Sequence, residues 1–190
     1  MKLSGSYQIN LEKQKVWDSL NDPEILKKSI PGCDEFKKNS DTEFTASATN
    51  KIGPFNATFT GDIELKDLNP PNSYKIIGSG NSPVGFANGE ASVNLEAFEG
   101  GTKLTYIVEA NVGGKIAQVG SRLIDMTAKK MADIFFGNFS KLISQSKDLE
   151  KNEKIENPNP KEEKSSSKIM MITLIGLISI AILAYFIAYK

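Results

Sequence analysis

Residues 113–143, "GGKIAQVGSRLIDMTAKKMADIFFGNFSKLI", decide the fold of this chain. Their apolar residues recur at intervals of three and four, the spacing of one face of an α-helix. We therefore predict one long amphipathic helix, weakened at most near Gly137, whose polar face meets solvent. The residues that define its apolar face are Ile116, Val119, Leu123, Met131, Ile134, Phe135, Phe139 and Leu142.

The residues before this helix have a different period. Apolar and polar side chains alternate, which indicates strands with one buried face. The sequences "NPPN" (69–72) and "EGGT" (99–102) predict hairpin turns, so neighbouring strands should be antiparallel. The predicted strands cover about 2–11, 34–38, 43–51, 55–68, 73–79, 86–98 and 102–112.

Two short helices are predicted after the first strand, over 12–21 and 23–29. Pro23 suits a first helical position, and Pro31 and Gly32 end the second helix. The order of one strand, two short helices, six strands and a long helix predicts an α+β fold. In this fold a curved antiparallel sheet grips the C-terminal helix.

Such a sheet can leave space between itself and the helix. The inward-facing apolar residues either fill a solid core or line a pocket. Small residues on that face, among them Ala57, Gly61, Gly89 and Ala91, favour the pocket because they leave volume unfilled. The residues that we predict to line it are Phe59, Ile63, Val93, Leu95 and Tyr106 from the sheet, Val119, Leu123 and Met131 from the helix, and Phe86 near the "SPVGF" loop.

The amino-acid composition excludes several kinds of catalytic and metal-binding site. The chain has no histidine and a single cysteine, Cys33, so it offers neither an ordinary zinc site nor a four-thiolate cluster nor a histidine acid or base. We expect no catalytic residues, no metal and no enzymatic activity. The 23 basic and 23 acidic residues balance, which does not indicate a nucleic-acid partner. Cys33 and Trp17 are expected to be packing residues.

The C-terminal residues 169–189 contain no Asp, Glu, Lys or Arg. A helix of this length spans about 30 Å, the thickness of the hydrocarbon core of a bilayer. We therefore predict a transmembrane tail anchor at 169–189, a charged flexible linker at 147–168 and a ligand-binding domain at 1–146. The N-terminus lacks the apolar segment of a signal peptide, so we expect a single-pass protein of the cell membrane with its domain in the cytoplasm.

Four stretches carry a resemblance to a known family: "WDSLNDPEILKKSIPGC", "KIGPFNATFTGDIEL", "SPVGFANGEASVNL" and "LTYIVEANVGGKIAQVGSRLIDMTAKKMADIFF". Over about residues 1–143 the chain resembles the G-subunit family of carbon monoxide dehydrogenase, within the START-like helix-grip superfamily. The resemblance implies a non-catalytic companion of a molybdenum-containing CO dehydrogenase. Such a companion brings the enzyme to the membrane, and its pocket holds a lipid or a respiratory quinone.

Two other roles stay open at this point. The domain could be a structural adaptor that docks the molybdenum enzyme while its interior is only a core. It could also be a maturation factor for that enzyme. If the chain handles electrons, they must reside on a bound organic molecule such as a quinone, because its residues offer no cofactor ligands of their own.

Overall fold

The computed structural model describes residues 1–153, with side chains up to residue 145. Seven strands form one antiparallel sheet in the order β1-β7-β6-β5-β4-β3-β2. The strands are β1 (Lys2–Ile9), β2 (Cys33–Lys38), β3 (Glu43–Ile52), β4 (Phe55–Asn69), β5 (Ser73–Ser82), β6 (Gly85–Phe98) and β7 (Gly101–Gly113). The helices are α1 (Lys13–Ser19), α2 (Pro23–Ser29), the 3-10 helix η1 (Lys115–Val119) and α3 (Ser121–Glu153).

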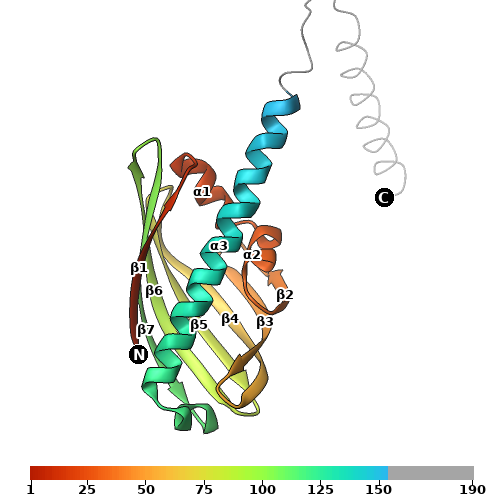
Figure 1. The fold of residues 1–190 in the computed structure, drawn as a ribbon, viewed down its shortest axis with the longest axis vertical. Coiled ribbons are helices and arrows are strands. Elements are labelled where there is room, and N and C mark those ends of the chain that lie inside the picture. Colours follow the sequence, from red (N-terminus) through yellow and green to blue (C-terminus); the bar gives the residue numbers. More distant parts are fainter. Residues whose placement is uncertain (154–190) are drawn as a thin grey trace, which may run out of the picture. The chain divides into compact units, whose positions relative to one another are not determined.

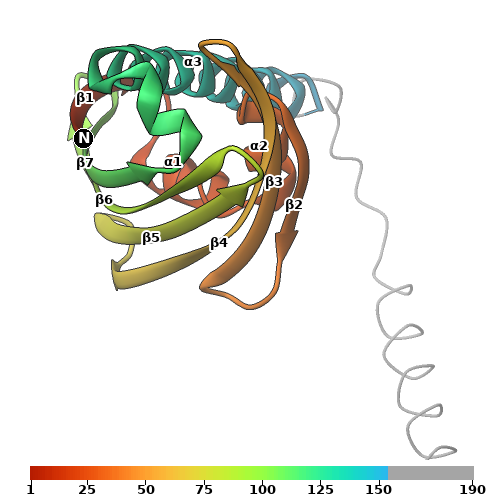
Figure 2. The same ribbon diagram turned by 90° about the horizontal axis from the view of Figure 1, so that it is seen from below.

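The sheet curves into a trough, and α3 lies across its open side (Figure 2). Helices α1 and α2 close one end of the trough, and η1 lies at the opposite end (Figure 1). We call these the α1–α2 end and the η1 end. Strands β2 to β7 follow one another as hairpins, whereas β1 pairs with β7 from the far end of the chain. The predicted helix-grip architecture is confirmed.

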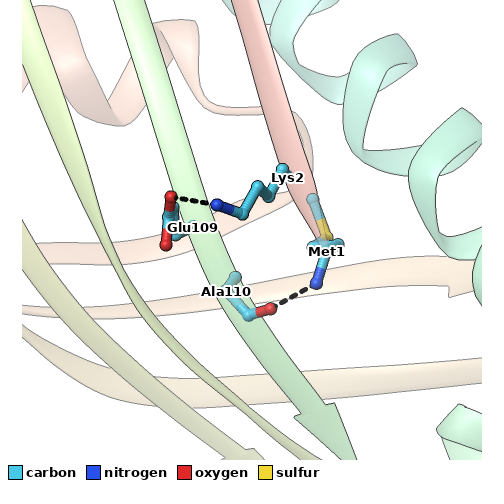
Figure 3. Close-up of polar contacts among 4 residues, drawn as sticks. All are labelled: Met1, Lys2, Glu109 and Ala110. Atoms are coloured by element: carbon cyan, nitrogen blue, oxygen red, sulfur yellow. Dashed lines mark hydrogen bonds and ion pairs between the residues drawn. The ribbon is translucent and has the colours of Figure 1, made fainter.

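The edge strand β1 is tied to β7 on the outer face of the sheet. The Lys2 ammonium lies 2.7 Å from a carboxylate oxygen of Glu109, and the Met1 amine donates a hydrogen bond to the Ala110 carbonyl at 2.6 Å (Figure 3). The ion pair is exposed, so it contributes little to stability. The strand is held mainly by its ladder with β7, which runs from Lys2 to Ile9.

Both predicted hairpin turns are present. Glu99 and Gly100 form a two-residue turn between β6 and β7, and both have positive φ values, 46° and 76°. Turns of this kind match the twist of the strands that they join. Pro70 to Asn72 connect β4 to β5, and the Pro70–Pro71 peptide bond is cis.

A cluster of buried apolar side chains lies at the α1–α2 end. Val16 and Phe139 are completely buried, and Leu104 is 1 % exposed. Trp17, predicted to be a packing residue, is 7 % exposed and meets the edge of the Tyr74 ring at a centroid distance of 5.3 Å. Because α1, the sheet and α3 all contribute to this cluster, it fixes the position of the long helix over the trough.

The prediction of one continuous helix from residue 113 is wrong at its start. Residues Lys115–Val119 form the 3-10 helix η1, and Gly120, with a φ of 89°, separates it from α3. The reason is tertiary: the Ile116 amide donates to the Val84 carbonyl at 2.9 Å and fixes η1 to the turn between β5 and β6. The predicted weak point at Gly137 lies inside α3, which continues through it.

The predicted tail anchor at 169–189 lies outside the described residues. Within residues 1–153, no helix combines the length and apolar character needed to cross a membrane. Helix α3 continues to Glu153, so the first residues of the predicted linker at 147–168 are helical. The rest of that linker also lies outside the described part of the chain.

Candidate ligand-binding site

An apolar cavity of about 200 Å³ lies between the sheet, α1, α2 and α3. Its walls come from six strands, from α2 and α3, and from Leu20, which follows α1. Ile63, Ile76 and Val93 lie on the sheet, and Phe135 and Phe136 lie on α3. The Tyr74 hydroxyl is the polar side-chain group in this lining. Burial raises the pKa of Tyr74, so this group stays neutral and the cavity carries no charge.

The volume of the cavity limits what it can hold. An apolar cavity of about 150 Å³ can admit a benzene ring, whereas sites for whole drug-sized ligands occupy about 300–1,000 Å³. This cavity therefore suits an apolar ring or the end of an apolar chain. The remainder of a larger ligand would have to lie elsewhere in the trough.

Towards the η1 end, the inner face of the sheet is built from small residues. Two neighbouring rows cross five strands, and eight of their ten members are Gly, Ala or Val. Most residues of both rows remain partly exposed, and strand alternation places them on the inner face of the sheet. The rows are Ala46, Gly61, Gly80, Ala87 and Val112, and Phe44, Ile63, Gly78, Gly89 and Ala110.

The facing side of α3 is also lined by small residues. Residues 11 and 18 positions apart on a helix share a face, so Asp125 lies on the same face as the buried Phe136 and Ile143. Between Asp125 and Phe136 this face carries Ala128 and Ala132, both half-buried. Small residues thus lie on both the sheet and the helix in this part of the trough.

Asp125 brings a polar atom into this face. Its Oδ1 atom is buried and has no hydrogen-bond partner among the described residues. Arg122 and Lys129 lie one turn away on either side of Asp125, but both are exposed. A buried polar atom without a partner is uncommon, because it has lost water without a replacement.

The turn between β3 and β4 lies against the start of α3 at the η1 end. Gly53, with a φ of 59°, forms this turn, and a Cβ atom at this position would lie 3.1 Å from Leu123 Cδ2 and 3.3 Å from Val119 Cγ1. Glycine is therefore needed for both the backbone conformation and the close approach. This contact places Val119 and Leu123 at the rim of the trough.

A sequence model of one family, described as the G subunit of carbon monoxide dehydrogenase (CoxG), matches residues 5–144 of the chain. The chain belongs to this family. It is also similar to a solved structure of a conserved protein from Geobacillus kaustophilus, with 32% sequence identity and a TM-score of 0.73. That match covers 77% of this chain and 97% of the other. A comparison with curated proteins gave no match.

More distant structures share only the fold of this CoxG family member. A protein from Thermus thermophilus has a TM-score of 0.60 at 9% identity, and the match covers 77% of this chain and 99% of the other. A protein from Chromobacterium violaceum has a TM-score of 0.59 at 11% identity, over 75% of this chain and 96% of the other.

The predicted ligand-lining residues of this CoxG family member fall into several groups. Ile63 and Val93 line the cavity. Leu95 and Tyr106 belong to the packed core cluster. Phe59 and Met131 are half-buried, and Val119 and Leu123 lie at the rim.

Phe86 does not lie with the other predicted residues. It pairs with Gly113, faces the outer side of the sheet and is 38 % exposed. The residue was chosen for its closeness to a loop, whereas strand alternation places Ala87 on the inner face. Sequence reasoning also missed Phe44 and Ile76, which line the cavity. Their alternation within β3 and β5 could have revealed them.

An aromatic cluster joins the sheet edge to α3 near the cavity. The Tyr7 ring stacks on Phe136 at a centroid distance of 4.1 Å, and its hydroxyl donates a hydrogen bond to Asp133. Burial and this hydrogen bond raise the pKa of Tyr7. The cluster holds α3 against β1, so opening the trough along this edge would break both contacts.

Cys33 lies outside this site. It begins β2, is half-buried, and its thiol donates to the Glu35 carbonyl at 3.3 Å. Burial raises the pKa of the thiol, which lowers its reactivity as a nucleophile. Among residues 1–153, no three His, Cys, Asp or Glu side chains gather closely enough to hold a metal ion.

Proposed function

We propose that this chain is a non-catalytic accessory protein of a molybdenum-containing CO dehydrogenase, which it recruits to the membrane. We further propose that it binds a lipid or a respiratory quinone in the trough beneath α3. Family membership supports the enzyme partner. The apolar cavity of about 200 Å³, next to an inner face of small residues, carries the ligand proposal.

The apolar lining of the trough suits a ligand that is taken from the membrane and released again. Each methylene moved from water into an apolar site contributes about 0.8 kcal/mol. A ligand that comes from the bilayer gains little of this, because lipid tails are as apolar as leucine side chains. Exchange between trough and membrane is then close to balanced, and selectivity must come from the ligand's head group and from shape.

The single tryptophan provides a direct test of binding. Trp17 contacts Tyr74, which lines the cavity, so a bound quinone should quench its fluorescence. The matched variants are Ile76→Phe and Ile77→Phe, because Ile76 lines the cavity whereas its neighbour Ile77 is exposed on the outer face.

We expect Ile76→Phe to weaken binding of a short-chain quinone at least about tenfold, which corresponds to fewer than two buried methylenes. Ile77→Phe should bind like the unmodified protein. Equal affinities in the two variants would contradict binding in this cavity.

Extraction of the purified domain followed by mass spectrometry separates the carrier from the other roles. A carrier should release close to one lipid or quinone per chain. An adaptor would be empty in every preparation yet still bind the dehydrogenase. A maturation factor would instead leave the dehydrogenase without its cofactor in cells that lack this protein.

A further inference from the structure

Asp125 is the one described residue with a buried side-chain oxygen or nitrogen atom that has no hydrogen-bond partner. It lies in the second turn of α3, on the face that carries Phe136 and Ile143 towards the sheet. The cavity and the surrounding core are otherwise apolar. A carboxylate in this position must obtain its partner from outside the chain or remain without one.

The distance from Asp125 to the cavity suits an elongated ligand. Eleven residues separate Asp125 from Phe136, which lines the cavity, and this corresponds to about 16 Å along the helix. Ala128 and Ala132 occupy the same face between them, so this stretch of the helix carries only methyl side chains towards the sheet. A ligand whose apolar end fills the cavity could extend its head group to Asp125.

The chemistry of the carboxylate restricts that head group. An ionised carboxylate only accepts hydrogen bonds, so its partner must carry an O–H or N–H group. A quinone head group presents carbonyl oxygens, which also only accept. The reduced quinol presents hydroxyl groups and can donate. A long-chain alcohol offers the same chemistry.

We propose that Asp125 accepts a hydrogen bond from a hydroxyl group of the bound ligand, so that the protein binds a quinol in preference to the corresponding quinone. This inference rests on the proposed ligand-binding function and adds the selectivity of the site. Preference for the reduced form stabilises it, and a tenfold preference raises the midpoint potential of the bound couple by about 30 mV.

The test compares probes that differ only in the donor group. Residues 1–152 form one compact unit that contains the whole core cluster, so this fragment is used. Its Trp17 fluorescence is titrated, without oxygen, with a three-isoprene ubiquinone and its quinol, and with geranylgeraniol and its methyl ether, because these probes are long enough to extend from the cavity to Asp125. The first pair tests a quinol, and the second pair tests an alcohol.

We expect the donor in at least one pair to bind about tenfold more tightly than its partner. Asp125→Asn should remove most of this ratio, because an amide can both donate and accept. Asp41→Asn, on an exposed loop, makes the same change of charge and should leave the ratio intact. Selectivity in the quinol pair identifies a quinol ligand, and selectivity in the alcohol pair alone identifies a lipid alcohol.

Equal affinities within both pairs, or a ratio that survives in Asp125→Asn, would overturn the role of Asp125 while leaving ligand binding intact. Absence of binding by all four probes would overturn the proposed function itself. If Asp125→Asn does not fold, the midpoint potential of the bound ubiquinone couple in the unmodified fragment decides. A potential at or below that of the free couple contradicts preference for the quinol.

Discussion

Asp125 shows how a single residue can conflict with the packing around it. Buried polar groups are almost always hydrogen-bonded, and leaving one without a partner costs about 1–3 kcal/mol. The Oδ1 atom of Asp125 has no partner among the described residues. Such residues commonly serve a ligand at the expense of stability in the free protein.

Replacement of Asp125 by leucine, which has the same branching and the same number of heavy atoms, tests this cost. We expect Asp125→Leu to raise the free energy of unfolding of the ligand-free fragment 1–152 by about 1–3 kcal/mol, because the unpaired oxygen is removed. Denaturant unfolding followed by Trp17 fluorescence measures the change. Asp41→Leu, which alters an exposed aspartate, should not be stabilising. A less stable Asp125→Leu fragment would contradict the assignment of an unsatisfied carboxylate.

At the scale of elements, the shape of the trough depends on close approach between strands. Gly61 of β4 and Gly80 of β5 are cross-strand partners, but their surroundings differ. A Cβ atom at Gly61 would lie 1.6 Å from the Ser79 carbonyl oxygen, whereas one at Gly80 would lie 3.9 Å from Phe59 Cβ. The strands can bend closely at Gly61 only because it lacks a side chain.

Alanine substitution at these two positions should therefore have opposite effects. We expect Gly61→Ala to lower the free energy of unfolding by about 2 kcal/mol or more, because the Ser79 backbone must move. Gly80→Ala should be neutral or stabilise by about 0.4–1 kcal/mol, since alanine restricts the unfolded chain. Urea unfolding of both variants measures the difference. Similar losses in the two variants would show that the bend does not depend on Gly61.

At the scale of the whole molecule, the folded domain and the predicted anchor should have separate roles. Every residue of the core cluster lies within residues 1–143, so the fold does not require the C-terminal segment. We therefore expect the apolar segment at 169–189 to affect where the protein is located in the cell and not whether the domain folds. Proximity to the bilayer would supply an apolar ligand to the trough.

Location can be tested without disturbing the fold. We expect the full chain to sediment with membranes and to resist carbonate extraction, whereas fragment 1–152 stays in the supernatant. The variant Leu177→Lys with Ile178→Lys should also be released, because each central lysine costs about 2.5–3.5 kcal/mol on insertion. The control exchanges the same residues, Leu177→Ile with Ile178→Leu. Retention of the lysine variant in the membrane pellet would contradict the transmembrane prediction.

Sequence periodicity and turn residues predicted the strands and helices well, but they predicted only some of the residues that line the cavity. Alternation and turn residues placed the strands, and Pro23 marked the start of α2 correctly. Strand phase placed Ile63 and Val93 on the cavity wall. It could not reveal that Leu95, which shares a face of β6 with Val93, does not line the cavity, because the side chains opposite the two residues differ.

The sequence by itself determined the α+β class, the order of the elements and the inward face of each strand, because these follow from local periodicity. Only the tertiary structure decided where η1 ends and α3 begins, since the hydrogen bond from Ile116 to Val84 joins segments distant in sequence. It also decided that large side chains and the apolar cavity lie at the α1–α2 end, while small residues and Asp125 line the trough towards η1. Packing depends on which side chains come into contact in the folded chain, and the sequence pattern of a single strand or helix does not show these contacts.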